Sequence, residues 1–361
     1  MSQSRITISG YYGFDNAGDE AVLAGLVQAF GHAGRSNPPK LTALSIAPEA
    51  TQRSHGIAAA HRYKIGPLLS AIKGCDLFLS GGGSLLQDVT SAHGIFYYCG
   101  VVRLAQILGK RTMFIAQGIG PLLRPRSQKL VAGVANRLHA ITVRDPESAD
   151  LLLGIGVQQR IQLTADPALI LAMGARSRPG SGPVTVSLRT WADADQSLPA
   201  TLAQACATAF SDVPMGTLAM QPALDSAPLE QFRREWHQST GQQATEFAVS
   251  APATDRVPEI VQHLAASRLV VGMRLHALIL AASAGIPSVA LAYDPKIQSF
   301  MRSTGQEDAV VDLRADAETL RATIAQVAAD LPGRTDRLRQ RLPALREAAM
   351  RNAEVALDLL S

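Results

Sequence analysis

The sequence of 361 residues has few aromatic side chains, few charges and few cysteines. Aromatic residues make up 5%, and no run of Lys and Arg is interleaved with them, so we expect no nucleic-acid partner. The three cysteines, Cys75, Cys99 and Cys206, are odd in number and lack the spacing of metal ligands. We therefore expect no metal site and a reducing, cytoplasmic compartment.

Long hydrophobic runs are also scarce. The start of the chain lacks the apolar stretch of a signal peptide, which again predicts a cytoplasmic protein. Residues 269–293 are mostly apolar, but Gly285 and Pro287 interrupt them, and Arg274 inside a membrane span would cost about 2.5–3.5 kcal/mol. Hydrophobic residues reach 47%, and the formal net charge is +4. This composition predicts a substantial core and suits an anionic substrate or an anionic membrane surface.

Short apolar runs alternate with helix-like stretches along the whole chain, which predicts βα units around mostly parallel sheets. Residues 173–184, rich in Gly, Pro, Ser and Arg, are predicted to link two domains. We predict an α/β protein with two Rossmann-like domains facing a cleft, residues 1–175 and 183–330, and a helical segment 335–361 broken near Pro343. The predicted strands are 6–9, 41–46, 77–80, 112–116, 140–143 and 161–163, then 184–188, 217–220, 246–249, 269–271, 288–292 and 310–313.

The segment 269–293 combines a buried pattern with two ionisable residues, Arg274 and His276. Its pattern predicts a strand, a turn at Gly272, a helix and a second strand. Arg274 and His276 then fall in the first helical turn, at a sheet edge where α/β proteins bind ligands and anions. Two interpretations remain open: a small-anion site with a titratable group, or a structural Arg–carboxylate pair beside a core histidine.

Two loops in the first half place polar residues and glycines after strands. Asn16 and Asp19 precede an apolar helix, where they either cap it or face a ligand. Gly83 ends a run of three glycines whose N–H groups can cradle a phosphate or a sugar, and Asp88 comes shortly after it. A tight turn is the simpler alternative. Neither loop has the spacing of a nicotinamide site or a P-loop.

Arg144 and Lys296 occupy equivalent places, each beside an Asp-Pro pair after a strand. Arg144 either clamps an anion or pairs with Asp145, and Lys296 is either a surface lysine or part of a site with His276. The turn 164–168 is interpreted as structural. The C-terminal segment carries six arginines that form a solvated helix face or contact an anionic membrane surface, at about 1 kcal/mol per basic residue. They are Arg334, Arg337, Arg339, Arg341, Arg346 and Arg351.

Seven motifs between Gly10 and Ile297 follow one another along the chain: GYYGFDNAGDEAVL, SGGGSLLQD, GIGP, RDPES, ADPA, GMRLHALILAASAGIP and AYDPKI. By their order and spacing they resemble the bacterial polysaccharide pyruvyl transferase family, particularly its cell-surface-anchoring group. The resemblance implies a two-domain, GT-B-like fold. It also implies transfer of pyruvate from phosphoenolpyruvate, a co-substrate, onto a sugar of a cell-wall or surface polysaccharide precursor as a cyclic ketal, with release of phosphate and no cofactor.

The resemblance implies that Arg144, His276 and Lys296 are catalytic, and that Arg274 helps them to bind the donor. The acceptor is expected beside Asn16, Asp19, Gly83 and Asp88. The implied partners are phosphoenolpyruvate and a sugar acceptor; a lipid-linked acceptor would place the protein at the inner face of the membrane. A nucleotide-sugar-dependent glycosyltransferase of the same fold and a non-catalytic glycan- or anion-binding protein remain alternatives.

Overall fold

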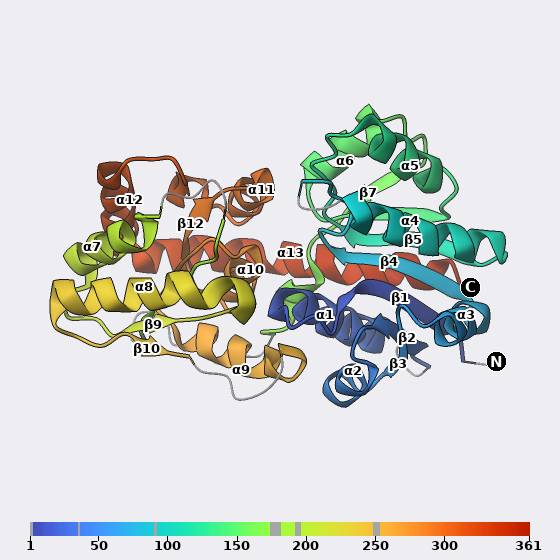
Figure 1. Cartoon of the computed structure of the whole chain (residues 1–361), viewed down its shortest axis with the longest axis horizontal. Helices are drawn as coiled ribbons and strands as arrows, with labels where there is room; N and C mark the ends of the chain where they lie inside the picture. Colours follow the sequence, from blue (N-terminus) through green and yellow to red (C-terminus); the bar gives the residue numbers. More distant parts are fainter. Residues whose placement is uncertain (1–2, 35–36, 90–91, 174–181, 192–195, 248–252) are drawn as a thin grey trace. The chain divides into compact units, whose positions relative to one another are not determined.

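The computed structural model describes residues 3–34, 37–89, 92–173, 182–191, 196–247 and 253–361 (Figure 1). Most of the predicted linker 173–184 and the end of the predicted strand 246–249 lie outside these residues. By its internal contacts the chain forms two compact units. Unit 1 contains Met1–Leu171, Ala253–Asp255 and Ala344–Ser361, and unit 2 contains Ala172–Pro252 and Arg256–Pro343.

Unit 1 is built on seven parallel strands in the order β3-β2-β1-β4-β5-β6-β7, the strand order of doubly wound α/β folds. The strands are β1 (Arg5–Tyr12), β2 (Lys40–Ser45), β3 (Ala58–His61), β4 (Leu77–Gly83), β5 (Arg111–Gln117), β6 (Ala140–Val143) and β7 (Ile161–Leu163). The helices are α1 (Ala17–Ala33), α2 (Pro48–His55), α3 (Ile65–Gly74), α4 (Ala92–Ile107), α5 (Pro125–Ala135), α6 (Pro146–Gly154) and the short 3-10 helix η1 (Pro167–Ile170).

Strand β3 is absent from the strands predicted by the sequence. Its four residues, Ala58, Ala59, Ala60 and His61, pair with β2 at the margin of the sheet. Alanine is depleted in strands, so the local sequence carries no strand signal. Pairing with β2 supplies the backbone hydrogen bonds instead, and this tertiary context decides the conformation.

Unit 2 repeats the same topology with six strands in the order β10-β9-β8-β11-β12-β13. The strands are β8 (Val184–Ser187), β9 (Met215–Thr217), β10 (Thr245–Glu246), β11 (Leu269–Gly272), β12 (Ser288–Ala292) and β13 (Val310–Asp312). The helices are α7 (Leu198–Phe210), α8 (Pro222–Thr240), α9 (Ala253–Ala266), α10 (Leu275–Ser283), α11 (Pro295–Ser303), η2 (Glu307–Ala309) and α12 (Ala317–Ala329). The two predicted Rossmann-like domains are therefore present.

The C-terminal helix α13 (Leu331–Asp358) is continuous, so the predicted break near Pro343 is wrong. A proline removes one backbone hydrogen bond without ending every helix, provided that packing holds the turns on either side. The boundary between the units falls directly after Pro343. The last part of α13 belongs to unit 1, where Asn352 accepts hydrogen bonds from Thr142 (2.7 Å) and Thr164 (2.9 Å). Residues 335–358 are thus part of one helix that contributes to both units.

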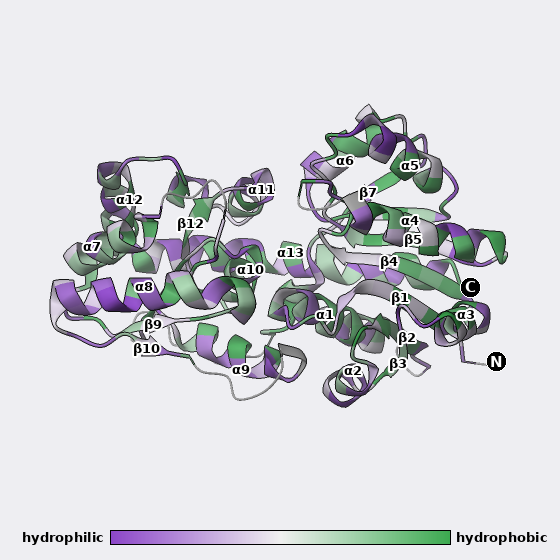
Figure 2. Ribbon diagram, in the orientation of Figure 1, coloured by the Kyte–Doolittle hydropathy of each residue, from purple (hydrophilic) through white to green (hydrophobic). Residues whose placement is uncertain are grey.

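The cores lie at the strands. All seven residues of β4 and all five of β12 are buried, as expected for parallel strands covered on both faces. Figure 2 shows β4 and β5 as largely hydrophobic, whereas α8 is largely hydrophilic. The buried strands therefore fix the positions from which the loops at their ends begin.

Candidate functional site

Most of the predicted site residues lie at the carboxyl edge of one of the two sheets. In unit 1, Asn16 and Asp19 follow β1 and Gly83 ends the neighbouring β4. In unit 2, Arg274 and His276 follow β11, which pairs with β8. In both units these strand pairs are the points where the strand order reverses, and open α/β sheets bind ligands in the crevice there.

The loop after β1 is held by its own polar side chains. Asn16 caps α1: its Oδ1 accepts from the backbone N–H of Gly18 (3.1 Å), and its Nδ2 donates to Asp19 Oδ2 (2.6 Å). Glu20 Oε1 accepts from the N–H of Gly13 (2.7 Å), and its Oε2 lies 3.0 Å from His55 Nε2. Asn16 thus acts as the cap that the sequence allowed, and it also orients the Asp19 carboxylate.

Gly83 brings the β4 loop against Asp19. The backbone of Gly83 has φ +104, and a Cβ at this position would lie 2.8 Å from Asp19 Oδ1. A side chain would therefore displace the carboxylate as well as strain the backbone. The structure brings together three of the four predicted acceptor residues: Asn16, Asp19 and Gly83.

Asp88 is the fourth predicted acceptor residue, and it has a different environment. Its carboxylate oxygens accept from the backbone N–H groups of Leu123 (2.7 Å) and Arg124 (3.0 Å), at the start of α5. Burial alone would raise the pKa of Asp88, but these hydrogen bonds outweigh it and hold the pKa below its ordinary value. The geometry describes an anchor for the loop before α5, and an acceptor role for Asp88 stays a prediction.

An arginine beside this loop carried no signal in the sequence. Arg62 follows β3, is 2% exposed, and donates through Nη1 to the carbonyl of Gly10 (2.7 Å). Its guanidinium lies over the rings of Tyr97 (4.3 Å), Phe14 (5.0 Å) and Tyr63 (5.1 Å). These contacts fix the loop that carries Asn16 and Asp19. Arg62 was missed because β3 itself gave no signal.

Arg144, at the end of β6, is firmly paired within unit 1. Its Nη1 donates to Asp166, its Nη2 donates to Ser84 Oγ (3.0 Å), and its Nε lies 4.0 Å from Asp145. Gly118 makes room for it, since a Cβ there would lie 2.7 Å from Arg144 Nε. Asp145 also caps α6, because its Oδ1 accepts from Ser148 N (2.8 Å).

Asp166 lies in the turn 164–168, to which the sequence assigned no chemistry. It caps η1 by accepting from Ala168 N (2.9 Å), and it also holds Arg144. The ADPA motif therefore positions the arginine of the RDPES motif. The strand order places β6 beside β7, so the turns at the ends of these two strands are neighbours.

In unit 2, Arg274 has the carboxylate partner that one interpretation required. Its Nη2 lies 2.7 Å from Asp225 Oδ1, its Nε donates to Asp225 Oδ2 (3.0 Å), and Nη2 also donates to Gln221 (3.3 Å). Burial raises the pKa of Asp225, and Arg274 opposes that rise. Asp225 comes from α8, far away in the sequence, which is why no local pattern revealed it.

His276 and Lys296 lie in the first turns of α10 and α11, the helices of two neighbouring βα units. His276 is the second residue of α10 and is half-buried, whereas Lys296 is the second residue of α11 and is 7% exposed. Asp294 caps α11 by accepting from the N–H of Lys296 (2.9 Å). Because β11 pairs with β12, both residues belong to the same carboxyl edge, near two helix N-termini that favour anions.

A pocket of about 400 Å³ opens at the same edge of unit 2, and its lining includes Arg189, Trp191, Arg234 and Met273. The Arg189 guanidinium lies over the rings of Trp191 (5.2 Å) and Tyr293 (5.7 Å), and Nη1 donates to the Tyr293 hydroxyl (3.4 Å). Arg189 follows β8, so it was detectable as a cation after a strand. It adds positive charge near Arg274 and Lys296.

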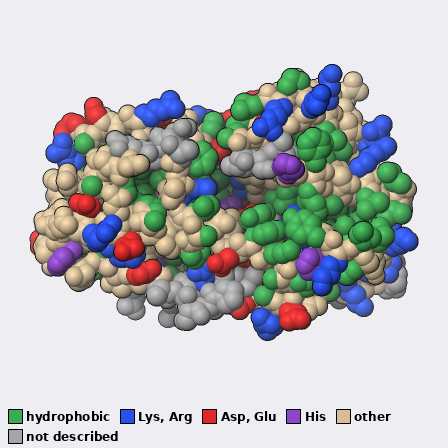
Figure 3. Space-filling model, viewed as in Figure 1, with side chains coloured by type: hydrophobic (Ala, Val, Ile, Leu, Met, Phe, Trp, Pro, Cys, Tyr) green, Lys and Arg blue, Asp and Glu red, His purple; other side chains and the backbone are tan. Residues whose placement is uncertain are grey.

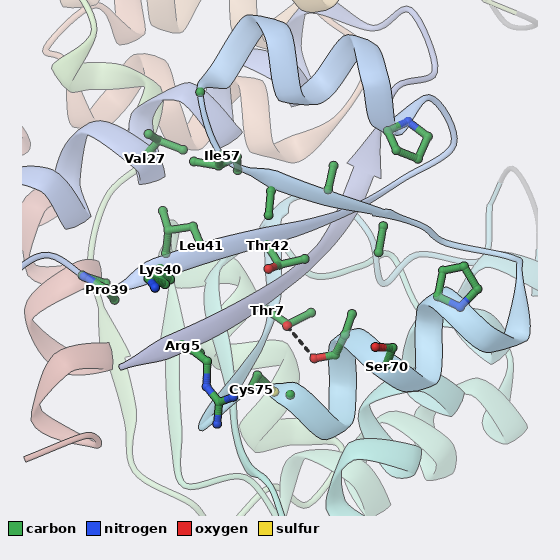
Figure 4. A pocket seen from close by; sticks show the side chains of 18 of the residues that line it. Arg5, Thr7, Val27, Pro39, Lys40, Leu41, Thr42, Ile57, Ser70 and Cys75 are labelled. Carbon is green, nitrogen blue, oxygen red and sulfur yellow. Dashed lines mark hydrogen bonds between the residues drawn. The ribbon is translucent and has the colours of Figure 1, made fainter. Parts of the chain in front are cut away.

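A larger pocket of about 1260 Å³ lies in unit 1, around β1, β2, β3, α2 and α3 (Figure 4). Arg5 and Lys40, at the starts of β1 and β2, line it, and Thr7 bonds the carbonyl of Ala71 across it (3.0 Å). None of the predicted site residues belongs to its lining. The larger of these two pockets therefore lies away from the predicted site residues.

The cysteines are buried, and burial raises the pKa of Cys99 and Cys206 to about 12, so neither is a nucleophile at neutral pH. In the part of the chain that the structure describes, no three His, Cys, Asp or Glu residues are placed to hold a metal ion. Over those same residues, no helix combines the length and the apolar character needed to cross a membrane.

Solved structures of sugar-nucleotide enzymes share this fold. A putative UDP-N-acetylglucosamine 2-epimerase from Listeria monocytogenes is 13% identical, with a TM-score of 0.63 over 97% of this chain and 94% of its own. The UDP-N-acetylglucosamine 2-epimerase from Neisseria meningitidis, bound to UDP-GlcNAc, is 10% identical, with a TM-score of 0.60 over 99% and 100%. The calicheamicin glycosyltransferase CalG4 is 13% identical, with a TM-score of 0.54 over 100% and 99%. These similarities show that the fold is GT-B-like.

No curated protein sequence matches the chain. Residues 16–295 match the sequence pattern of a protein family described as "Polysaccharide pyruvyl transferase". The matched range includes all the predicted site residues except Lys296, which directly follows it. The match covers most of the chain and begins at Asn16, the residue that caps α1. The chain belongs to the polysaccharide pyruvyl transferase family.

Proposed function

We propose that this transferase moves pyruvate from phosphoenolpyruvate onto a sugar of a cell-wall or surface polysaccharide precursor as a cyclic ketal. The observation that carries the proposal is the cationic carboxyl edge of unit 2. Arg189, Arg274 and Lys296 follow three of its strands, and His276 lies among them. A small dianion with a carboxylate and a phosphate matches such a cluster, because arginine binds both groups through its planar fork.

The donor is assigned to Arg274, His276 and Lys296, with Arg144 of unit 1 as a further anion ligand. Arg274 and Arg144 are already held by Asp225 and Asp166, so their guanidinium groups are fixed in orientation. Preorganised charge of this kind stabilises charge that develops during a reaction without a reorganisation cost. No cofactor takes part in this scheme.

In the proposed reaction, protonated His276 transfers a proton to the methylene carbon C3 of phosphoenolpyruvate, which makes C2 electrophilic. A sugar hydroxyl attacks C2 and loses its proton, and the C2–O bond to phosphate breaks, releasing inorganic phosphate. A second hydroxyl then adds to C2 with loss of its proton and closes the ketal. Histidine suits this step because an imidazole ring can both donate and accept a proton.

The acceptor is assigned to the carboxyl edge of unit 1, beside Asn16, Asp19 and Gly83. Asp19 is the better candidate for the base that takes the hydroxyl protons, because both oxygens of Asp88 already serve backbone N–H groups. Asp19 Oδ1 lies close to Gly83, where the lack of a side chain leaves the carboxylate in place. A lipid-linked acceptor would place the reaction at the cytoplasmic face of the membrane.

The decisive experiment measures inorganic phosphate released from phosphoenolpyruvate, with and without a panel of lipid-linked and synthetic amino-sugar disaccharides. We expect release that depends on a sugar, and a product heavier by one pyruvate ketal in mass spectrometry. Turnover of a UDP-sugar, with phosphoenolpyruvate inert, would replace the proposal by a glycosyltransferase. A thermal shift with phosphoenolpyruvate but no phosphate release with any acceptor would favour a binding protein.

A further inference from the structure

One long stretch of unit 1 is almost free of acidic residues. From Ile57 to Arg144 the sequence has eleven Lys and Arg residues and only two acidic residues, Asp76 and Asp88. Asp88 is buried and hydrogen-bonded, and Asp76 is paired with Arg5 (3.3 Å). Arg62 is buried and Arg144 is paired with Asp166, so nine further cations of the stretch carry positive charge that Asp76 and Asp88 hardly compensate.

The same stretch exposes large apolar side chains. Tyr63, Ile65, Phe96, Ile107 and Leu123 are exposed by 55%, 74%, 54%, 68% and 70%. Among the described residues of unit 2, Met173 at its start is exposed by 48%, and from Gly182 to Pro343 no large hydrophobic side chain is similarly exposed. Scattered exposed leucines are ordinary, but a gathered apolar area marks an interaction surface.

These residues lie in or directly before the three helices α3, α4 and α5 of unit 1. The Tyr63 and Tyr97 rings lie 5.3 Å apart, which places the start of α3 beside α4, and Lys110 after α4 donates to the carbonyl of Lys73 in α3 (2.7 Å). On the other flank of α4, Gln106 donates to the carbonyl of Val134 in α5 (3.2 Å). The three helices pack their inner sides on one core. We call their outward side the α3–α5 face.

Cations surround the apolar residues of this face. The exposed lysines and arginines of this face are Lys64, Lys73, Arg103, Arg124, Arg126 and Lys129. Figure 3 shows a broad hydrophobic area over unit 1, in the region of α3 and α4, with Lys and Arg near its margin and no Asp or Glu over it. On α4 the outward positions are His93, Phe96, Gly100, Arg103 and Ile107, so this mostly apolar helix turns both kinds of residue outward.

We propose that the α3–α5 face docks the protein on an anionic membrane surface. Apolar side chains within a basic surround match the boundary of a bilayer, where the apolar residues enter the headgroup layer and the cations meet the lipid phosphates. A second copy of this chain would bring like charges together, which disfavours a dimer through this face. The proposal concerns binding only and does not depend on the proposed chemistry.

The test is sedimentation of the full chain with phosphatidylcholine vesicles, with and without phosphatidylglycerol, at low and high ionic strength. We expect binding only with phosphatidylglycerol, weakened by salt. The triple variant Lys73→Glu, Arg103→Glu and Lys129→Glu should weaken that binding by about 100-fold or more, since each basic residue contributes about fivefold. All three side chains are exposed, and circular dichroism checks that the variant remains folded.

A matched control reverses three exposed arginines of unit 2, Arg302, Arg314 and Arg321, and should bind as the parent does. A second variant, Ile65→Ser with Ile107→Ser, keeps every charge and should also lose binding. Equal losses in the triple variant and the control would reduce the effect to net charge and overturn the proposal. So would equal binding to neutral vesicles, no binding to either kind of vesicle, or loss of binding only when the C-terminal arginines Arg337 and Arg351 are reversed.

Discussion

The two units share a strand order but differ in the loops after their strands. At the carboxyl edge of unit 1, glycines, a capping asparagine and the Asp19 carboxylate gather. The equivalent edge of unit 2 gathers Arg189, Arg274 and Lys296, and Arg274 is paired there with the buried carboxylate of Asp225. One topology thus supports two different sets of polar side chains, because the loops carry them and the sheet only fixes where the loops start.

The largest expected effect separates chemistry from binding at the edge of unit 2. Replacing His276 by Ala should lower kcat by at least about 100-fold, since general acid–base groups contribute about 10² to 10⁴. Donor binding, measured by a thermal shift with phosphoenolpyruvate, should persist because the cations remain. His237→Ala, an exposed histidine of the same unit, is the control and should keep full activity. Near-normal turnover of the His276 variant would remove this residue from the mechanism.

The second-largest effect concerns Asp225, the buried carboxylate that pairs with Arg274 in unit 2. Asp225→Asn leaves the buried Arg274 without its ion-pair partner and should cost about 3–5 kcal/mol of unfolding free energy. Glu318→Gln, which breaks the exposed pair with Arg321, should cost about 0–1 kcal/mol. Urea unfolding of both variants measures the contrast. Similar small losses would mean that Asp225 contributes only packing.

A smaller effect should distinguish an anion ligand from a structural pair in unit 1. Arg144→Lys keeps the charge but loses the planar fork, so we expect the KM for phosphoenolpyruvate to rise by about tenfold or more, as for hydrogen bonds to charged groups. Arg137→Lys, exposed on the same unit, should change nothing. If the Arg144 variant lost stability but kept its KM, the arginine would serve only to join Asp166 to Ser84.

The smallest effect tests Asp88 as an anchor. Its pKa is lowered in the folded state, so its stabilising contribution is present above its unfolded pKa and disappears as the pH falls through its folded pKa. Asp88→Asn should therefore cost about 1–2 kcal/mol at neutral pH and progressively less in acid. Thermal unfolding of the parent and the variant across the acid range measures whether their stabilities become equal as the pH falls. A loss independent of pH would point to packing, and a raised KM for the sugar would restore the acceptor role.

The sequence predicted most of the fold because the periodicity of apolar residues and the turn residues between them are local signals. The strands that precede Asn16, Arg144, Arg274 and Lys296, and the strand that Gly83 ends, were all placed in advance. Partners could not be predicted in the same way. The carboxylate of Arg274 comes from α8, and the buried Arg62 follows a strand made mostly of alanines. Such pairings depend on tertiary contacts that no spacing in the chain encodes.

The path of α13 has a consequence for the order in which the molecule can be completed. Unit 1 begins at the N-terminus, yet Asn352, near the last residue, is bonded to Thr142, Thr164 and the carbonyl of Ala165 (2.9 Å). During synthesis the first sheet must wait for these bonds until unit 2 has emerged. Contacts so distant in sequence slow folding. A chain shortened before Ala344 would leave its first domain unfinished, although every strand of that domain would be present.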